Sequence, residues 1–179
     1  VDRGYLRVVT AYNPLFFTYD ETGKAVGIVA EMAHEFEKFL NETLEPKNKT
    51  VDVIVYAVPR DKILNYVVEG RADIASANLT VTAERSDIVS FTEPLLRDVS
   101  EVVVSGPDAG KKSSFDDFSS TAVHLRRSSS YFAHLRDLNF GRTEAGSSEI
   151  PVVTVEEYLE DHDILDLVDK GVFPATIVD

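Results

Sequence analysis

The stretch ADIASANLTVTAERSDIVSFTEP, from Ala72 to Pro94, decides how the rest of the chain is interpreted. It begins with ADIASA, a short apolar segment that is typical of a buried strand in a parallel sheet. The residues that follow, NLTVTAER, have the composition of a polar loop leading into a helix. In open parallel sheets, ligands bind beyond the carboxyl ends of the strands. We therefore expect Asn78 to Arg85 to lie at the ligand-binding edge of a sheet.

The side chains of this loop suit a small carboxylate. Thr80 and Thr82 supply hydroxyls, and the start of a helix supplies unpaired backbone N–H groups. Arg85 adds a planar fork of donors that fits a carboxylate with two hydrogen bonds. A second interpretation is that Thr82 caps a helix and Arg85 pairs with Glu84 or Asp87 on the surface. The pattern by itself leaves both interpretations open.

The segments before Ala72 alternate between the patterns of strands and helices. YLRVVTA (5–11) and VDVIVYAV (51–58) are rich in β-branched residues, as strands are. GIVAEMAHEFEKFL (27–40) predicts an amphipathic helix, and Asp61 can cap a second helix that stops at Gly70. The apolar stripe predicted for the first helix consists of Ile28, Met32, Phe36, Phe39 and Leu40. This β-α-β-α-β order predicts a largely parallel sheet with helices on its faces.

A second, smaller α/β region follows. Residues 86–105 contain two further extended pieces, DIVSF and VSEVVVS. The next segment, GPDAGKKSS, is rich in Gly, Lys and Ser, as domain boundaries are. The alternation then restarts with TAVHL, SSYFAHLRDL, IPVVTV, ILDLVDKG and ATIVD. We therefore predict two α/β lobes, residues 1–105 and residues 106–179.

The second lobe ends on a strand at Asp179, without a closing helix or a return crossover. We therefore expect a C-terminal return segment to be missing. Without it, the sheet of the first lobe keeps an unpaired edge or an exposed apolar face. Self-association at high concentration is the expected consequence.

Composition excludes several classes of partner and site. The chain has 179 residues, a net charge of −13 and no cysteine, which excludes disulfides and thiolate metal sites. Nucleic acids and anionic membranes are poor partners for such an acidic chain. No apolar run is long enough to span a membrane, and Val1 is typical of a chain from which a signal peptide has been removed. The four histidines lack metal-ligand spacing, so we predict no metal site and no cofactor.

Catalysis by paired carboxylates is a weaker interpretation of the acidic residues. Glu31, Glu35, Asp73 and Glu93 are candidates for glycoside chemistry. Glu31 and Glu35, however, fall on the solvated side of an amphipathic helix. We predict no catalytic residues in this chain.

The block from Thr80 to Pro94 resembles the signature of the periplasmic solute-binding proteins for polar amino acids. That signature is an apolar strand, a Thr-x-Thr-x-x-Arg turn and a further strand ending near a proline, and TAYNPLFFTYDETGKAVGIVAEMAHEF is similar to the opening of the same family. VSEVVVSGP, RRSSSYFAHL and GVFPATIVD look closest to the substrate-binding regulatory domain of membrane-bound lytic transglycosylase F. The resemblance implies a two-lobed periplasmic-binding-protein-like fold.

The resemblance also implies binding residues in the first lobe. Thr80 and Arg85 match the residues that hold the ligand α-carboxylate. Asn78 matches a contact position where many relatives have glycine, and Tyr12 matches the aromatic residue that lies against the ligand. For Tyr12, ordinary packing at the end of a strand is the alternative.

In the second lobe, the resemblance points to a turn that opens a helix. Ser128 and Ser129 are expected to offer hydroxyls and backbone N–H groups to the ligand carboxylate, with Arg127 in place of a frequent glycine. The alternative is that one of the two serines only caps the helix. Asp179 matches the acidic residue that binds the ligand ammonium group.

These observations predict a binding module outside the cytoplasm rather than an enzyme. Its expected ligand is a small carboxylate, an amino acid or a cell-wall peptide, bound between two lobes that close about a hinge. The first hypothesis is a sensor domain that regulates a lytic transglycosylase domain. The alternatives are a free amino-acid receptor that delivers to an ABC permease and a small dehydratase on the same fold.

Overall fold

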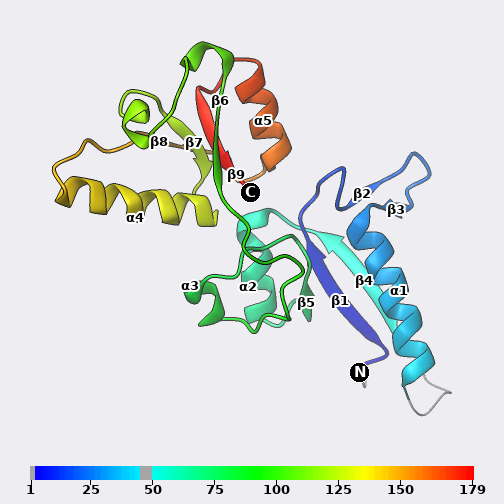
Figure 1. Cartoon of the computed structure of the whole chain (residues 1–179). Coiled ribbons are helices and arrows are strands. Elements are labelled where there is room, and N and C mark those ends of the chain that lie inside the picture. Colours follow the sequence, from blue (N-terminus) through cyan, green and yellow to red (C-terminus); the bar gives the residue numbers. More distant parts are fainter. Residues whose placement is uncertain (1–2, 45–49) are drawn as a thin grey trace. The chain divides into compact units, whose positions relative to one another are not determined.

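The computed structural model describes residues 3–44 and 50–179 and divides the chain into two compact units, Val1–Thr92 and Glu93–Asp179 (Figure 1). Val1 lies outside the described residues. The sequence analysis places the boundary after Ser105, whereas the structure places β6 (Val102–Ser105) in the sheet of the second unit. The reason is that β6 pairs antiparallel with β9 (Ala175–Val178).

The first unit is built on a three-stranded parallel sheet, as predicted. The strand order is β4-β1-β5, with β1 at Tyr5–Thr10, β4 at Asp52–Ala57 and β5 at Ile74–Ala75. A small antiparallel hairpin, β2 (Thr18–Tyr19) and β3 (Ala25–Val26), precedes the first helix. The helical segments are α1 (Ile28–Thr43), η1 (Arg60–Lys62), α2 (Ile63–Val68) and α3 (Ala83–Ser86).

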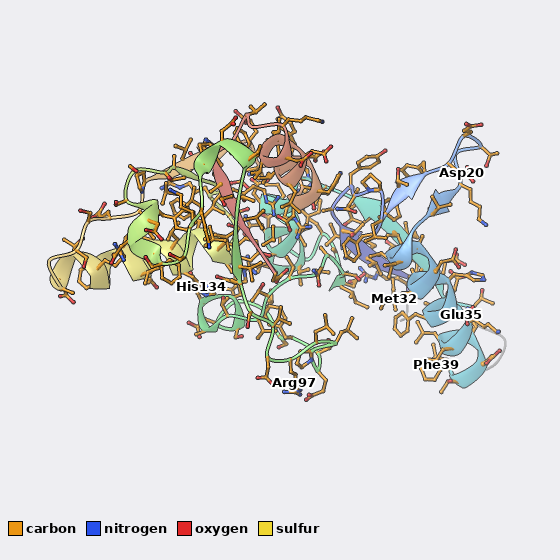
Figure 2. All side chains as sticks on the ribbon, turned by 45° about the horizontal axis from the view of Figure 1, so that its top comes forward. Asp20, Met32, Glu35, Phe39, Arg97 and His134 are labelled. Carbon is orange, nitrogen blue, oxygen red and sulfur yellow. The ribbon has the colours of Figure 1, made fainter. Side chains whose placement is uncertain are left out.

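The predicted apolar stripe of α1 is wrong in its orientation. Met32 and Phe39 are 47% and 58% exposed (Figure 2), and Ile28 is exposed as well. The buried residues of α1 are Val29 and Ala33.

Polar side chains of α1 explain this rotation, because they bond to the backbone of the neighbouring strand. Glu37 Oε2 accepts a hydrogen bond from the Val53 N–H at 2.7 Å. The Asn41 amide bonds both the N–H and the C=O of Val51, at 2.8 and 3.0 Å. These bonds satisfy backbone groups at the start of β4 that a parallel neighbour would otherwise have to pair.

The extended piece predicted for DIVSF does not form a strand. The N–H groups of Ile88 and Val89 bond to the carbonyl of Arg85, at 3.2 and 3.1 Å, so the chain continues the turn of α3. Backbone donors used in a turn are not available for a sheet. The edges of the first sheet, β4 and β5, therefore have no added strand from this segment, and self-association through them stays a prediction.

The second unit contains a four-stranded mixed sheet of order β6-β9-β7-β8. β7 (Val123–Arg126) is parallel to β8 (Val152–Val155) and to β9. The helices are α4 (Ser130–Glu144) and α5 (Asp161–Asp169), with the short turns η2 (Pro107–Ala109) and η3 (Phe115–Phe118). The Gly106–Ser114 segment that resembles a boundary is thus a loop inside this unit.

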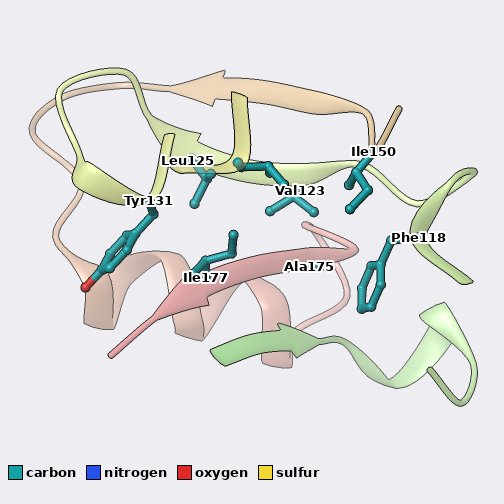
Figure 3. Close-up of a cluster of buried hydrophobic side chains, with 8 residues drawn as sticks. Phe118, Val123, Leu125, Tyr131, Ile150, Ala175 and Ile177 are labelled. Carbon is teal, nitrogen blue, oxygen red and sulfur yellow. The ribbon is translucent and has the colours of Figure 1, made fainter. Parts of the chain in front are cut away.

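The core of the second unit gathers side chains from β7, β9, α4 and η3 (Figure 3). Val123 and Leu125 of β7 and Ile177 of β9 meet Tyr131 and Leu135 of α4. Each such side chain contributes about 1.5–3 kcal/mol when it leaves water. This packing fixes the start of α4 against the end of β7, where the predicted Ser128 and Ser129 lie.

An ion-pair cluster ties the start of β1 to β5. Asp73 accepts hydrogen bonds from the Arg7 backbone N–H and guanidinium, at 2.9 and 3.1 Å, and from Arg3 at 2.6 Å. The Arg7 hydrogen bond, with the help of Arg3, holds the pKa of Asp73 well below its ordinary value, although burial opposes this shift.

We predict that this cluster makes stability fall in acid. A carboxylate with a depressed pKa stabilises the fold above its unfolded pKa of about 3.9 and loses that contribution as the pH falls further. Urea unfolding at pH 7 and pH 3 should therefore show a loss that is smaller in Asp73→Asn than in the wild type. Asp87→Asn, at an exposed position of the same unit, is the control and should keep the full loss. An unchanged pH dependence in Asp73→Asn would contradict this account.

Gly27 sets the approach of the preceding loop to α1. Its φ is +111°, and a Cβ added there would lie 2.6 Å from the carbonyl oxygen of Phe16. That carbonyl accepts the Val29 N–H at 2.8 Å and so completes the helix start. We predict that Gly27→Ala destabilises the protein by about 2–4 kcal/mol, from backbone strain and steric overlap together.

Gly23→Ala is the matched control for Gly27→Ala. Gly23 also has a positive φ, +81°, but no atom lies within 4 Å of an added Cβ. Strain alone should destabilise by about 1–2 kcal/mol. Chemical denaturation of the two variants measures the difference, and equal losses would show that the contact with Phe16 is unimportant.

Candidate functional site

The loop after β5 turns sharply at Asn78, the first residue of the predicted ligand-binding segment. Ala77 is buried, and the chain then turns at Asn78, which has a φ of +48° and is exposed. Asparagine is one of the few residues besides glycine that adopt this left-handed conformation at low energy. This explains how Asn78 can stand at a position where the resemblance expects glycine.

Arg85 folds back over this turn. Its Nη1 donates to the carbonyl oxygen of Thr80 at 2.9 Å, which links the two residues predicted to bind a carboxylate. Thr82 caps α3, as the second interpretation held, because its hydroxyl accepts from the Arg85 N–H at 3.2 Å. α3 is only four residues long, so the electrostatic effect of a helix start is small here. The chemistry of the corner therefore depends on the guanidinium and the Thr80 side chain.

Arg60 is a second cation at this corner, and the sequence analysis missed it. Its Nη1 donates to the carbonyl oxygen of Ala77 at 2.9 Å, so it holds the loop just before Asn78. Arg60 follows β4, and the loop from Asn78 follows β5, at the same edge of a parallel sheet. A search for charged residues just beyond each predicted strand would have found it.

Tyr12 follows β1 and therefore lies along the same edge of the first sheet. Tyr12 is 58% exposed and is not part of the core. Its hydroxyl accepts a hydrogen bond from the Thr18 hydroxyl at 2.8 Å. The structure thus places Tyr12, Arg60 and the Asn78–Arg85 loop at the carboxyl edge of one sheet.

In the second unit, both predicted serines have partners within the chain. Ser129 caps α4: its hydroxyl donates to the Arg126 carbonyl at 2.8 Å and accepts from the Phe132 N–H at 3.2 Å. Ser129 therefore caps α4, and its contact with a ligand stays a prediction. Ser128 donates through its N–H and its hydroxyl to the carboxylate of Glu157. Nothing in the sequence pattern singled out Glu157.

Arg126, immediately before these serines, is a structural cation. Its side chain is only 2% exposed, and it donates to the carbonyl of Leu159 and to the carboxylate of Asp161. A buried guanidinium is tolerated because it is paired and hydrogen-bonded. Arg126 thereby fixes the segment after β8 to the end of β7.

Asp179 lies at the end of β9, and the buried Tyr131 contacts it. Burial raises the pKa of the Tyr131 phenol, and the negative charge of Asp161 and a hydrogen bond to Asp179 raise it further. The neutral phenol is therefore the stable form of Tyr131. Asp179, the predicted ammonium-binding residue, follows β9 and therefore lies at the same edge of the sheet as Ser128 and Glu157, which follow β7 and β8.

The described residues contain neither a cluster of metal ligands nor a helix that could span a membrane. Over residues 3–44 and 50–179, no group of three or more His, Cys, Asp or Glu side chains is placed to hold a metal ion. Within the same ranges, no helix has the length and apolar character needed to cross a membrane. A surface hollow of about 800 Å³ in the first unit is lined by Tyr5, Arg7, Tyr56 and Tyr66 among others, and includes none of the predicted site residues.

The fold is that of a two-lobed α/β binding protein of the periplasmic type, and in each unit polar, charged loops follow the carboxyl ends of the parallel strands. Residues 6–171 match the model of the bacterial extracellular solute-binding proteins, family 3, and the chain belongs to this family. The family is extracellular by its description, in agreement with the predicted location; removal of a signal peptide stays a prediction. A comparison with curated proteins found no match.

Several solved structures share the fold. An ancestral arginine-binding protein bound to arginine is 24% identical, with a TM-score of 0.73, and the match covers 99% of this chain and 70% of that protein. An ancestral amino-acid-binding protein, a precursor of cyclohexadienyl dehydratase, is 21% identical (TM-score 0.75; 99% and 71% covered). A protein from Wolinella succinogenes DSM 1740, described as a binding component of an ABC transporter and complexed with lysine, is 20% identical (TM-score 0.72; 99% and 69% covered).

We predict that Asn78 is required for its backbone conformation. Asn78→Ala should destabilise the protein by about 1 kcal/mol, because alanine adopts a positive φ only at a cost, while Asn78→Gly should leave stability nearly unchanged. Thermal or urea denaturation of the two variants measures this. If both variants lose the same stability, the asparagine amide rather than the backbone is what the fold needs.

Proposed function

We propose that this chain binds the α-carboxylate of an amino acid, or of a short cell-wall peptide, at the corner made by Thr80 and Arg85. The observation that carries the proposal is the bond between the Arg85 guanidinium and the Thr80 carbonyl at the end of β5, in a chain of a solute-binding family. That bond uses one of the five N–H donors of the guanidinium and fixes its plane. Tyr12 and Asn78 lie along the same edge and complete the proposed contact.

The proposal includes a contribution from the second unit. Asp179, which follows β9, is the proposed partner of the ligand ammonium group. Ser128 and Ser129 form the turn at which a second part of the ligand is bound. Binding is expected without catalysis, in keeping with the function of the family.

The biological setting has two candidates. The stretches VSEVVVSGP, RRSSSYFAHL and GVFPATIVD favour a sensor domain that regulates a lytic transglycosylase. The likeness to a protein described as a binding component of an ABC transporter favours a receptor that delivers an amino acid to a permease. A thermal-shift screen with the common amino acids and with muropeptide fragments separates them: muropeptide binding supports the sensor, and binding of free amino acids alone supports the receptor.

A dehydratase activity is the third candidate, because one structural neighbour is a precursor of cyclohexadienyl dehydratase. Turnover of a prephenate-like acid by the purified chain would establish it. Stable binding of an amino acid without turnover favours the binding function.

We predict that Arg85→Lys weakens amino-acid binding although it keeps the charge. Lysine offers a point charge instead of a planar fork, so the expected loss is about 1.5–3 kcal/mol of binding free energy. Thr80→Val should lose about 0.5–1.5 kcal/mol, the contribution of one neutral hydrogen bond. Isothermal titration calorimetry with the best ligand of the screen measures both losses.

Arg97→Lys is the control for Arg85→Lys. Arg97 forms an exposed ion pair with Glu93, and its replacement should leave affinity unchanged. If Arg85→Lys binds as tightly as the wild type, Arg85 is not in the site and the proposed function loses its main support.

A further inference from the structure

In the second unit, the carboxylate of Glu157 occupies the hydrogen-bond donors of Ser128. The proposed function assigns these donors to the ligand. The Ser128 N–H donates to Glu157 Oε1 at 3.1 Å, and the Ser128 hydroxyl donates to Oε2 at 2.5 Å. Each carboxylate oxygen therefore receives one bond. This two-point contact is the arrangement in which a ligand carboxylate would bind to Ser128.

Strand register explains why these two residues meet. β7 and β8 are parallel, and Arg126 pairs with Val155. Ser128 and Glu157 each lie two residues beyond that pair, so the chain brings them to the same point of the sheet edge. Arg126 then fixes the segment after Glu157 through Leu159 and Asp161. The strand register and the bonds of Arg126 therefore fix the backbone position of Glu157 next to Ser128.

The negative charge of Glu157 is not neutralised within the described parts of the chain. Its two hydrogen-bond donors, both from Ser128, are neutral, and no basic side chain forms an ion pair with it there. Two cations precede Ser128 in the chain: Arg126 is paired with Asp161, and the exposed Arg127 forms no ion pair with Glu157 within the described residues. Glu157 is only half-buried, and a carboxylate has about four acceptor positions, of which Ser128 uses two.

A second carboxylate has two disadvantages at this position. It would have to displace Glu157, which the chain holds at a high effective concentration, and it would face the repulsion of a like charge. A guanidinium or ammonium group has neither disadvantage, because it can bond to the acceptor positions that Ser128 leaves open. Asp179, at the end of the adjoining strand β9, adds to the negative charge of this edge.

We infer that Glu157 is a specificity-determining residue, which keeps ligand carboxylates off Ser128 and selects a ligand with a basic side chain. This inference rests on the proposed function, and it assigns the α-carboxylate to the Arg85 corner alone. The competing explanation is that Glu157 only holds the turn before α4 through Ser128 and never meets a ligand.

The exclusion of carboxylates can be tested without the physiological ligand. Acetate is titrated while the backbone amide resonance of Ser128 is followed by NMR. In the wild type and in the control Glu156→Ala, we expect the resonance to stay in place, because Glu157 occupies the donors. In Glu157→Ala, acetate should shift it in a saturable way. The exclusion is overturned if acetate shifts the wild-type resonance as far as that of Glu157→Ala, or shifts neither.

The choice of ligand is tested by calorimetry with L-arginine and L-glutamine. Glu157→Gln keeps the size of the side chain and an acceptor for Ser128, so folding is preserved more readily than in the alanine variant. We expect it to weaken L-arginine about tenfold, which corresponds to ~1.4 kcal/mol, and to leave L-glutamine within about twofold. The control Glu156→Gln, at an exposed neighbouring position, should change neither affinity.

Other results of this experiment are equally decisive. If Glu157→Gln lowers the melting temperature but leaves L-arginine affinity intact, Glu157 only holds the turn before α4 and the inference is wrong. A tighter complex of Glu157→Gln with L-arginine also overturns it. If the wild type binds no amino acid, the proposed function and the ligand class both fail, while the acetate titration still decides whether Glu157 blocks Ser128.

Discussion

The parallel pairing of strands determines which side chains of this protein can act together. Parallel strands require a crossover after each strand, and every crossover starts from the same edge of the sheet. In the first unit, this brings Tyr12, Arg60 and the Asn78–Arg85 loop to one edge, although they are far apart in the sequence. In the second unit, the same constraint brings Ser128, Glu157 and Asp179 together. The chemistry of each edge is thus a consequence of strand order.

Local pattern was sufficient to predict the strands of the first sheet, but not the face that α1 buries. The pattern assigns Met32 and Phe39 to the core because they are apolar and correctly spaced. The observed face is decided instead by Glu37 and Asn41, which bond to the start of β4. A hydrogen bond to a particular backbone group depends on the neighbouring strand, so the helix sequence alone does not contain it.

In the candidate site, too, local sequence predicts nearby residues but not contacts between residues far apart in the chain. The spacing of Thr80, Thr82 and Arg85 was enough to find the loop after β5, because all three residues are local. Arg60 and Glu157 were missed, since their contacts to Ala77 and Ser128 span 17 and 29 residues of sequence. Such pairs become visible only when the strand register is known. Residues that lie two positions beyond paired residues of neighbouring parallel strands, as Ser128 and Glu157 do, can therefore be predicted to meet once the register is known.

The sheet edge of the first unit carries guanidinium groups, and the sheet edge of the second unit carries carboxylates. In both units, hydrogen bonds to neutral groups orient the charged side chains. At the first edge, neutral carbonyl oxygens of Ala77 and Thr80 orient the guanidinium groups of Arg60 and Arg85. At the second edge, the neutral N–H and hydroxyl of Ser128 orient the carboxylate of Glu157. A neutral partner fixes the direction of a charged group without cancelling its charge, whereas an ion pair such as Arg126–Asp161 does both. The direction of these charged side chains is therefore set within each unit, by neutral groups that the strand order brings to the same edge.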